Sequence, residues 1–169
     1  MANNLKGRRR SDYVYFLTYR TRWFVAVLPK MALFHGKLSR PRSDNDQYSH
    51  MNNAVYNQLY DSIVNEYLAN HCGLQATVSP VIGLVVSSFS EFYRPVAYPQ
   101  MLELGLRVSR LGKRSVTYEV GVFEEGVETV AAAGGSTHVF VGSGSRKAVD
   151  MSKEIREGLE KLVVVGSKL

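Results

Sequence analysis

The stretch SDNDQYSHMNNAVY, residues 43–56, gathers the side chains of this chain that are best suited to chemistry. Two aspartates, Asp44 and Asp46, stand two positions apart, and a histidine and a pair of asparagines follow before the chain becomes apolar. An aspartate can act as a nucleophile or as a general base. The spacing therefore predicts a polar turn of chemical interest immediately before a helix.

Three common kinds of site do not match these residues. A calcium loop that started at Asp44 would need a glycine where Ser49 stands. A zinc site needs several histidines or cysteines, and only His50 is close, so we expect no metal. A serine hydrolase needs the pattern G-x-S-x-G, which neither GGSTH (134–138) nor GSGSR (142–146) fulfils.

Asp46 lies a few residues before the helix that we predict over residues 52–70. The first N–H groups of a helix have no partner within it, and the positive end of its dipole lies there. A substrate carbonyl that accepts such an N–H becomes electrophilic, and an aspartate opposite it can attack the carbonyl or activate a water. The alternative is that Asp44, Asp46, Asn52 and Asn53 only form a turn and cap the helix.

The elements that must position this turn follow from the periodicity of the chain. Apolar and aromatic residues surround most of the segment 52–70, so we expect a largely buried helix. A second helix, capped by Ser152, closes the chain. Five segments with the composition or the alternation of strands lie at residues 13–23, 83–96, 101–111, 115–123 and 129–141.

Short connections join most of the last four strands, which indicates antiparallel pairing. Gly134 and Gly135 predict a β-bulge within the last strand. One long apolar helix together with a meandering sheet predicts an α+β domain in which the sheet wraps the helix.

The stretch DNDQYSHMNNAVY resembles the signature R-x-R-W-x-D-x-D-x-x-G-H-V-N-N-x-x-Y of hotdog-fold acyl-CoA thioesterases of the 4-hydroxybenzoyl-CoA thioesterase-like group, in the thioesterase/thiol ester dehydrase-isomerase superfamily. Ser49 stands where glycine is usual, and Met51 stands where valine is usual. The resemblance continues through GLVVSSFSEFYRPVAYP and LGLRVSRLGKRSVTYEVGVF, with YRTRW upstream, and covers residues 43–141. It implies a hotdog fold, an antiparallel sheet wrapped around one long central helix, with a short C-terminal helix.

The resemblance also implies an activity, the hydrolysis of an acyl-CoA thioester to a free acid and CoA. Asp46 would be the nucleophile or the general base, and the backbone N–H near Asn53 would polarise the thioester carbonyl. His50 and Asn53 would shape the pocket or hold a water. No cofactor and no metal are implied, because CoA is part of the substrate. Members of the family are homodimers or homotetramers with sites between subunits.

The GKRS connection, residues 112–115, lies where the family grips the pantetheine and the phosphates of CoA. Lys113 and Arg114 suit a phosphate, and Ser115 completes this predicted CoA contact. Arg114 replaces a residue that is often serine in the family. The alternative is an ordinary solvated hairpin turn.

Two other functions remain open at the level of sequence. A hotdog protein without hydrolase activity could serve as a binding or scaffold subunit. A hotdog dehydratase could act on hydroxyacyl thioesters, although that chemistry usually needs an Asp/His pair in a different arrangement.

The segment FVAVLPKMALFHGKLSRPR, residues 24–42, separates RTRW from SDND, which are adjacent in the family pattern. It contains no acid, asparagine or glutamine. We interpret these nineteen residues as a foreign insertion, such as a translated unspliced intron. The alternative is a genuine loop of this protein.

The net charge of +6 belongs to one end of the chain. Residues 1–42 hold ten basic residues against one acid, whereas the remainder holds eleven basic and fourteen acidic residues. We therefore expect no nucleic-acid-binding face, and we expect KGRRR to belong to a solvated tail. The predicted organisation is a basic tail (1–12), a single domain (13–162) interrupted by the insertion, and a C-terminal tail (163–169).

No apolar run is long enough to span a membrane. The single cysteine, Cys72, cannot form an internal disulfide, and we expect a buried thiol. Both features fit the cytoplasm as the predicted location. A mitochondrial targeting signal is the alternative, because the first eleven residues are basic and lack acids.

Overall fold

The computed structural model describes residues 5–21, 44–46, 48–75 and 77–164. Two short 3-10 turns, Leu5–Gly7 and Arg10–Asp12, come first. The remaining elements are β1 (Tyr15–Arg20), α1 (Asn53–His71), β2 (Val81–Phe92), β3 (Met101–Leu111), β4 (Ser115–Glu124), β5 (Ala132–Gly142) and α2 (Lys153–Glu160). The predicted strands and both predicted helices are confirmed, most of them within three residues at each end. The predicted insertion, residues 24–42, lies outside the described residues.

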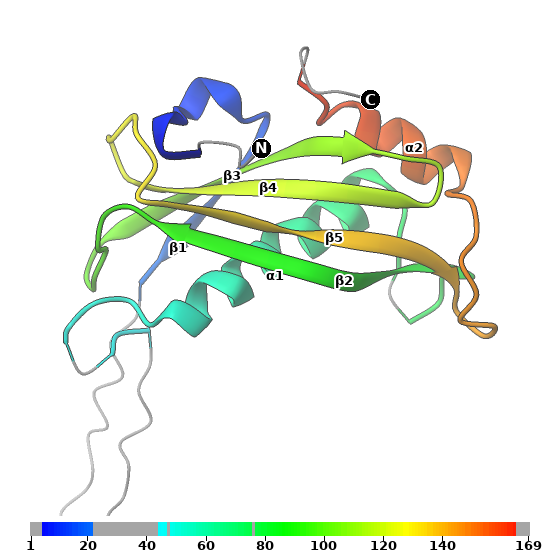
Figure 1. Cartoon of the computed structure of the whole chain (residues 1–169), viewed down its shortest axis with the longest axis horizontal. Helices are drawn as coiled ribbons and strands as arrows, with labels where there is room; N and C mark the ends of the chain where they lie inside the picture. Colours follow the sequence, from blue (N-terminus) through cyan, green and yellow to red (C-terminus); the bar gives the residue numbers. More distant parts are fainter. Residues whose placement is uncertain (1–4, 22–43, 47, 76, 165–169) are drawn as a thin grey trace, which may run out of the picture.

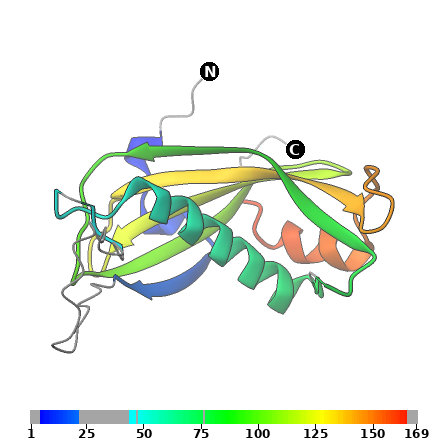
Figure 2. The same cartoon turned by 90° about the horizontal axis from the view of Figure 1, so that it is seen from below.

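The strands form one antiparallel sheet in the order β1-β3-β4-β5-β2. The sheet curves around α1, which crosses one of its faces (Figure 1, Figure 2). This confirms the predicted α+β architecture with a central helix. β2 is an edge strand, since it pairs with β5 on one side and with no described strand on the other.

The helix is buried because alternate residues of β3 and β4 meet its apolar side. Eight of its residues are buried, and Ile63, Val64 and Leu68 are at most 2% exposed. The core beneath α1 includes the fully buried residues Leu102, Leu104, Leu106, Tyr118, Val120 and Val122. Burial of these apolar side chains stabilises the fold mainly through the hydrophobic effect.

The bulge predicted at Gly134 and Gly135 is wrong. The register shift involving β5 falls on β2, between Val85 and Ser87. Gly134 serves a different purpose, because a Cβ at this position would collide with the ring of Tyr60 on α1. The glycine lets the helix approach the sheet, so its cause is tertiary packing and not local strand geometry.

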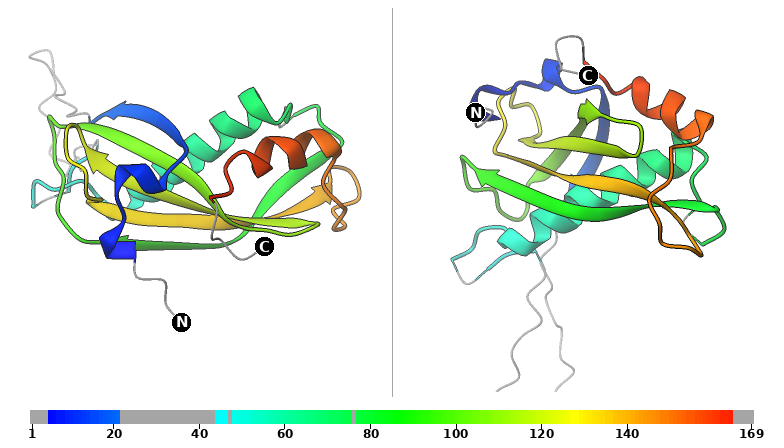
Figure 3. Two further views of the ribbon diagram at one scale, coloured as in Figure 1. Left: turned by 90° about the horizontal axis from the view of Figure 1, so that it is seen from above. Right: turned by 45° about the vertical axis from the view of Figure 1, so that its right-hand side comes forward.

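The C-terminal helix α2 packs beside the last turns of α1 (Figure 3). The predicted cap is confirmed, since the Ser152 hydroxyl accepts the N–H of Ile155 at 3.2 Å. The Tyr67 hydroxyl of α1 donates to the carbonyl of Gly158 at 2.8 Å, which ties the two helices together. Val163, expected in a C-terminal tail, pairs with Val108 beside β3. Among the described residues, no helix is both long and apolar enough to cross a membrane.

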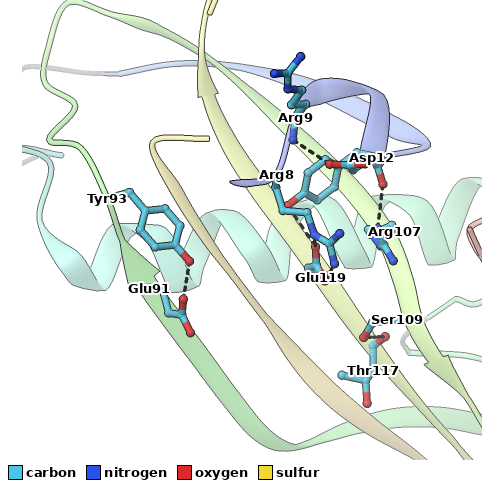
Figure 4. Close-up of polar contacts among 10 residues, drawn as sticks. Arg8, Arg9, Asp12, Glu91, Tyr93, Arg107, Ser109, Thr117 and Glu119 are labelled. Atoms are coloured by element: carbon cyan, nitrogen blue, oxygen red, sulfur yellow. Dashed lines mark hydrogen bonds and ion pairs between the residues drawn. The ribbon is translucent and has the colours of Figure 1, made fainter. Parts of the chain in front are cut away.

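The basic run near the N-terminus does not form the solvated tail that its composition predicts. Arg8 pairs with Glu119 of β4, with Nε 2.8 Å from Oε1, on the face of the sheet opposite α1 (Figure 4). Glu119 is 1% exposed. Tyr13 covers the same face, and a Cβ at Gly121 would come within 2.6 Å of its Cζ. The run is ordered by carboxylates more than ninety residues away, as the pair of Arg10 with Glu103 also shows.

We predict that Arg8→Met lowers the free energy of unfolding by about 2 kcal/mol, because it leaves the buried Glu119 carboxylate without its cation. The value is below that for a fully buried pair, since Arg8 keeps a quarter of its side chain exposed. The matched control is Arg9→Met, at an exposed neighbour that makes no ion pair with the described residues. Urea unfolding of both variants tests this, and equal losses would show that the pair is not stabilising.

Candidate functional site

The turn that carries the predicted site is anchored at both ends. Asp44 is buried, and its Oδ2 accepts the hydroxyl of Tyr19 on β1 at 2.9 Å. Its carbonyl accepts the N–H of Asn52 at 2.7 Å. The N–H of Met51 donates to the carbonyl of Val96 at 2.8 Å. Asp44 is thus a structural residue that fixes the turn to β1 and to the start of α1.

Asp46 is oriented by its own turn. Its Oδ1 accepts the backbone N–H groups of Tyr48, at 2.8 Å, and of His50, at 3.2 Å. Its N–H donates to the carbonyl of His50 at 2.7 Å. Among the described residues none donates to Oδ2, so this oxygen is left for a substrate or a water. The imidazole of His50 is exposed and likewise makes no hydrogen bond with the described part of the chain.

The first turn of α1 has a backbone donor without a partner among the described residues. Asn52 caps the helix, and its Oδ1 accepts the N–H of Ala54 at 2.9 Å. The carbonyl of Asn52 accepts the N–H of Val55 at 2.9 Å. The N–H of Asn53 donates to no described residue. It lies at the positive end of the helix dipole, where a carbonyl oxygen that gains negative charge is stabilised.

A cavity of about 310 Å³ opens beside this donor. Its lining comes from the first turns of α1 and the second half of β2, namely Asn53, Ala54, Asn57, Ser88, Phe89, Ser90 and Phe92. The ring of Tyr56 meets that of Phe92 edge-on, with centroids 4.9 Å apart. Burial raises the pKa of Tyr56 to about 12, so its hydroxyl stays protonated at neutral pH.

The contribution of β2 to this cavity was not among the sequence-based predictions. The signal for it was present, because Ser88 and Ser90 interrupt the apolar character of an otherwise β-branched and aromatic strand. The α1 neighbour of Ser90 is Asn57, which accepts its hydroxyl at 3.2 Å. Sequence alone does not reveal that β2 lies beside the first turns of α1.

The predicted CoA-binding residues do not line the cavity beside Asn53. The N–H of Gly112 donates to the carbonyl of Ser115 at 2.8 Å, which closes a hairpin turn with Lys113 and Arg114 at its tip. The Arg114 guanidinium hydrogen-bonds to Asp150 at 2.6 Å and lowers the pKa of that carboxyl. Lys113 is exposed and forms no ion pair with the described residues.

One chain does not bring the two halves of the predicted site together. Asp46 and His50 lie in the turn before α1, and Asn53 is the first residue of the helix; Asn45 and Met51 hydrogen-bond this turn to the loop that precedes β3. The 112–115 turn follows the far end of β3 (Figure 1). Eleven strand residues separate the two, which corresponds to about 35 Å.

In the part of the chain that the structure describes, neither a reactive thiol nor a metal cluster competes with this site. Cys72 is 1% exposed, and burial raises the pKa of its thiol to about 11, which confirms the predicted buried thiol. It lines a second cavity of about 200 Å³ between the end of α1 and α2. Within the described residues, no group of three or more histidine, cysteine, aspartate or glutamate side chains is placed to hold a metal ion.

Comparison with protein families places most of the chain in one of them. The model of the thioesterase-like superfamily matches residues 41–159, from just before the polar turn to the end of α2. A comparison with curated proteins found no match.

Solved structures share the fold along nearly the whole chain. PA5185 of Pseudomonas aeruginosa is 40% identical, with a TM-score of 0.80, over 94% of this chain and 98% of its own. Slr0204, a 1,4-dihydroxy-2-naphthoyl-CoA thioesterase from Synechocystis, has a TM-score of 0.65 at 13% identity, over 88% of this chain and 98% of its own. A thioesterase-superfamily protein from Jannaschia has a TM-score of 0.71 at 16% identity, over 90% and 94%. These similarities confirm the hotdog fold.

Ser49 has a φ of 65°, in the left-handed region that favours glycine, and glycine is the usual residue here in the family pattern. We predict that Ser49→Gly raises the free energy of unfolding by about 0.5 kcal/mol, because relief of strain exceeds the added freedom of the unfolded chain. The control is Ser62→Gly, the same change inside α1, which we expect to lower it by about 0.5 kcal/mol. Chemical denaturation measures both, and a loss of stability in Ser49→Gly contradicts the assignment of strain.

Proposed function

Since the chain belongs to the thioesterase-like superfamily, we propose that it hydrolyses an acyl-CoA thioester to a carboxylic acid and free CoA. The observation that supports this most is that the N–H of Asn53, at the start of α1, donates to no described residue and follows the Asp46 carboxylate by seven residues. A donor for a developing oxyanion and a base or nucleophile are the two parts that acyl transfer to water needs.

The proposed reaction uses Asp46 Oδ2 and the Asn53 N–H. The thioester oxygen accepts the N–H, which stabilises the charge that the oxygen gains in the transition state. Asp46 either takes a proton from a water that attacks the carbonyl carbon, or attacks that carbon itself to form an anhydride that water then cleaves. In both routes the C–S bond breaks, and the CoA thiolate leaves and takes up a proton.

The scaffold and dehydratase alternatives have less support. A dehydratase needs a histidine side chain at the reacting carbon, whereas His50 contributes its backbone to Asp46 and leaves its imidazole exposed. A scaffold protein would not require an oriented carboxylate in the turn before a helix whose first N–H has no partner among the described residues. Release of free thiol from a panel of acyl-CoA esters, measured with a thiol reagent, separates hydrolysis from both alternatives.

The proposed active unit is a homodimer that pairs through β2. This edge strand has twelve residues and a single charged one, Glu91, so it lacks the charges that usually protect an edge. Its exposed large apolar residues are Leu84, Val85, Val86, Phe89 and Phe92. Pairing of two copies about a two-fold axis would satisfy both edges at once.

A dimer could also bring a basic 112–115 turn near Asp46, which one chain alone does not do. Asp46 and the 112–115 turn are too far apart within a protomer to hold one thioester and the phosphates of its CoA. We assign the CoA phosphates to Lys113 and Arg114 of the second subunit, where Lys113 is the better candidate because Arg114 already pairs with Asp150.

We predict that Asp46→Asn lowers kcat by at least about a hundredfold, because the amide keeps the shape of the turn but is neither base nor nucleophile. Binding of CoA should persist. Asp44→Asn is the control, since Asp44 accepts the Tyr19 hydroxyl and the amide oxygen of an asparagine can still accept it. Steady-state thiol release and calorimetric CoA binding measure the two properties, and an Asp46→Asn enzyme with most of its turnover moves the chemistry elsewhere.

We also propose that residues 24–42 are foreign to the domain, because they separate RTRW from SDND, which are adjacent in the family pattern. Their removal leaves three residues between Thr21 and Asp44, enough to span about 14 Å. The residues on either side of the deletion contact the same loop before β3. The N–H of Thr21 donates to the carbonyl of Gln100 at 3.1 Å, and the N–H of Tyr98 donates to Asn45 Oδ1 at 3.2 Å.

We predict that the deletion of Phe24 to Arg42 gives a protein that melts several degrees higher and hydrolyses acyl-CoA several-fold faster. A first strand that leads directly into the turn holds Asp46 more firmly, and small misplacements of a catalytic group are costly. Differential scanning fluorimetry and thiol release compare the two chains. If the shortened chain unfolds or loses activity, the segment belongs to the protein.

A further inference from the structure

The polar turn before α1 is held by a second loop as well as by its own hydrogen bonds. This is the β2–β3 loop, residues 93–100, which lies at the same end of the domain as the start of α1 (Figure 1, Figure 2). The carbonyl of Val96 accepts the N–H of Met51 at 2.8 Å, and the N–H of Tyr98 donates to Asn45 Oδ1 at 3.2 Å. These two bonds hold the turn on both sides of the carboxylate proposed for catalysis, so the position of that carboxylate follows the position of the loop.

Glu124, the last residue of β4, ties the two ends of this loop together. Its Oε1 accepts Nε of Arg94 at 2.7 Å, and its Oε2 accepts the side-chain amide of Gln100. Gln100 Oε1 in turn accepts the N–H of Ala97 at 2.6 Å. The Arg94 guanidinium has no other acceptor among the described residues, and its Nη2 is buried without a partner there. The loop therefore depends on one carboxylate that lies outside it.

The place of Glu124 in the sheet does not require an acid for packing. Val120 and Val122 are fully buried in the core beneath α1, and the alternation of β4 puts Glu124 next in the same row. Burial, and then the nearby Glu124 carboxylate, raise the pKa of Tyr56 to about 12. Glu124 therefore lies close to the first turns of α1, at a position where an apolar side chain would pack as well.

We propose that Glu124 is a positioning residue for the hydrolysis, which fixes the β2–β3 loop through Arg94 and Gln100 and thereby fixes Asp46. This inference rests on the proposed function. Glu124 does not line the cavity beside Asn53, so its effect passes through the loop. Loss of its charge leaves the buried donors of Arg94 without an acceptor, which is costly enough to shift the loop. A small misplacement of a catalytic group lowers the rate strongly.

The first test is Glu124→Gln in the full chain, measured by thiol release from an acyl-CoA ester that the parent hydrolyses. We expect kcat to fall about tenfold while KM stays within about twofold, because the cavity is unchanged and only the carboxylate is displaced. The control is Glu125→Gln, the same change at an exposed neighbour whose side chain makes no hydrogen bond with the described residues. Differential scanning fluorimetry shows whether both variants are folded at the assay temperature.

Two further comparisons distinguish positioning from a purely structural role. Arg94→Lys keeps the positive charge beside Glu124 and should keep most of the turnover, whereas Arg94→Met should lose as much as Glu124→Gln. In the Asp46→Asn background, Glu124→Gln should lower the residual rate less than about twofold, because the group that it positions has already lost its chemistry. An equal loss in both backgrounds would show that Glu124 acts elsewhere and would overturn the inference.

The remaining outcomes separate this inference from the function on which it rests. If the parent hydrolyses no acyl-CoA, the proposed function falls and the inference falls with it. If the parent is active and folded Glu124→Gln keeps the parent's kcat, hydrolysis stands and the positioning role is overturned. If Glu124→Gln is unfolded at the assay temperature, Gln100→Leu decides, because it breaks one link and leaves the pair of Arg94 with Glu124. A Gln100→Leu enzyme with the parent's kcat would again overturn the inference.

Discussion

The position of the first turn of α1 is the constraint on which the candidate site depends. The helix cannot slide, because it is packed against the sheet, with Tyr60 seated over Gly134 and Ile63 fully buried. Asp44, which precedes the helix, fixes its N-terminal end. The carbonyl of Asp44 accepts the N–H of Asn52, and its carboxylate accepts the hydroxyl of Tyr19 on β1. A backbone N–H held this firmly can stabilise an oxyanion without reorganising, which is the main requirement for that kind of catalysis.

Local sequence patterns were enough to predict the strands, the helices and the polar turn before α1. They failed where contacts between distant residues decide the structure. Periodicity predicted β3 and α1 nearly to the residue, because each is long and strongly patterned. The polar turn before α1 was predicted because Asp46, Asn52 and Asn53 are close in sequence. The packing of Arg8 on Glu119 was missed, since the carboxylate comes 111 residues later and no local signal announces it. The bulge assigned to Gly134 failed for the same reason, because the partner of that glycine is a ring on the helix.

The separation of the two predicted halves of the site has a general cause. In an antiparallel sheet, the residues before and after a long strand lie at opposite ends of the domain. The turn with Asp46 is hydrogen-bonded to the loop before β3, and the basic turn follows β3, so one copy of the chain places these two predicted parts of the site apart. In the proposed dimer, a second copy related by a two-fold axis at β2 would have its sheet in the reverse direction and would offer its basic turn to the first.

The place of β2 at the edge of the sheet has a consequence for how such proteins diverge. Asp46 and Asn53 are positioned by the turn and the buried helix, whereas Ser88 and Ser90 lie on β2, which pairs only with β5 among the described strands of one copy. In the proposed dimer the same strand is both a wall of the cavity and the contact between subunits. A lineage that changes the cavity through β2 therefore also changes how its subunits associate.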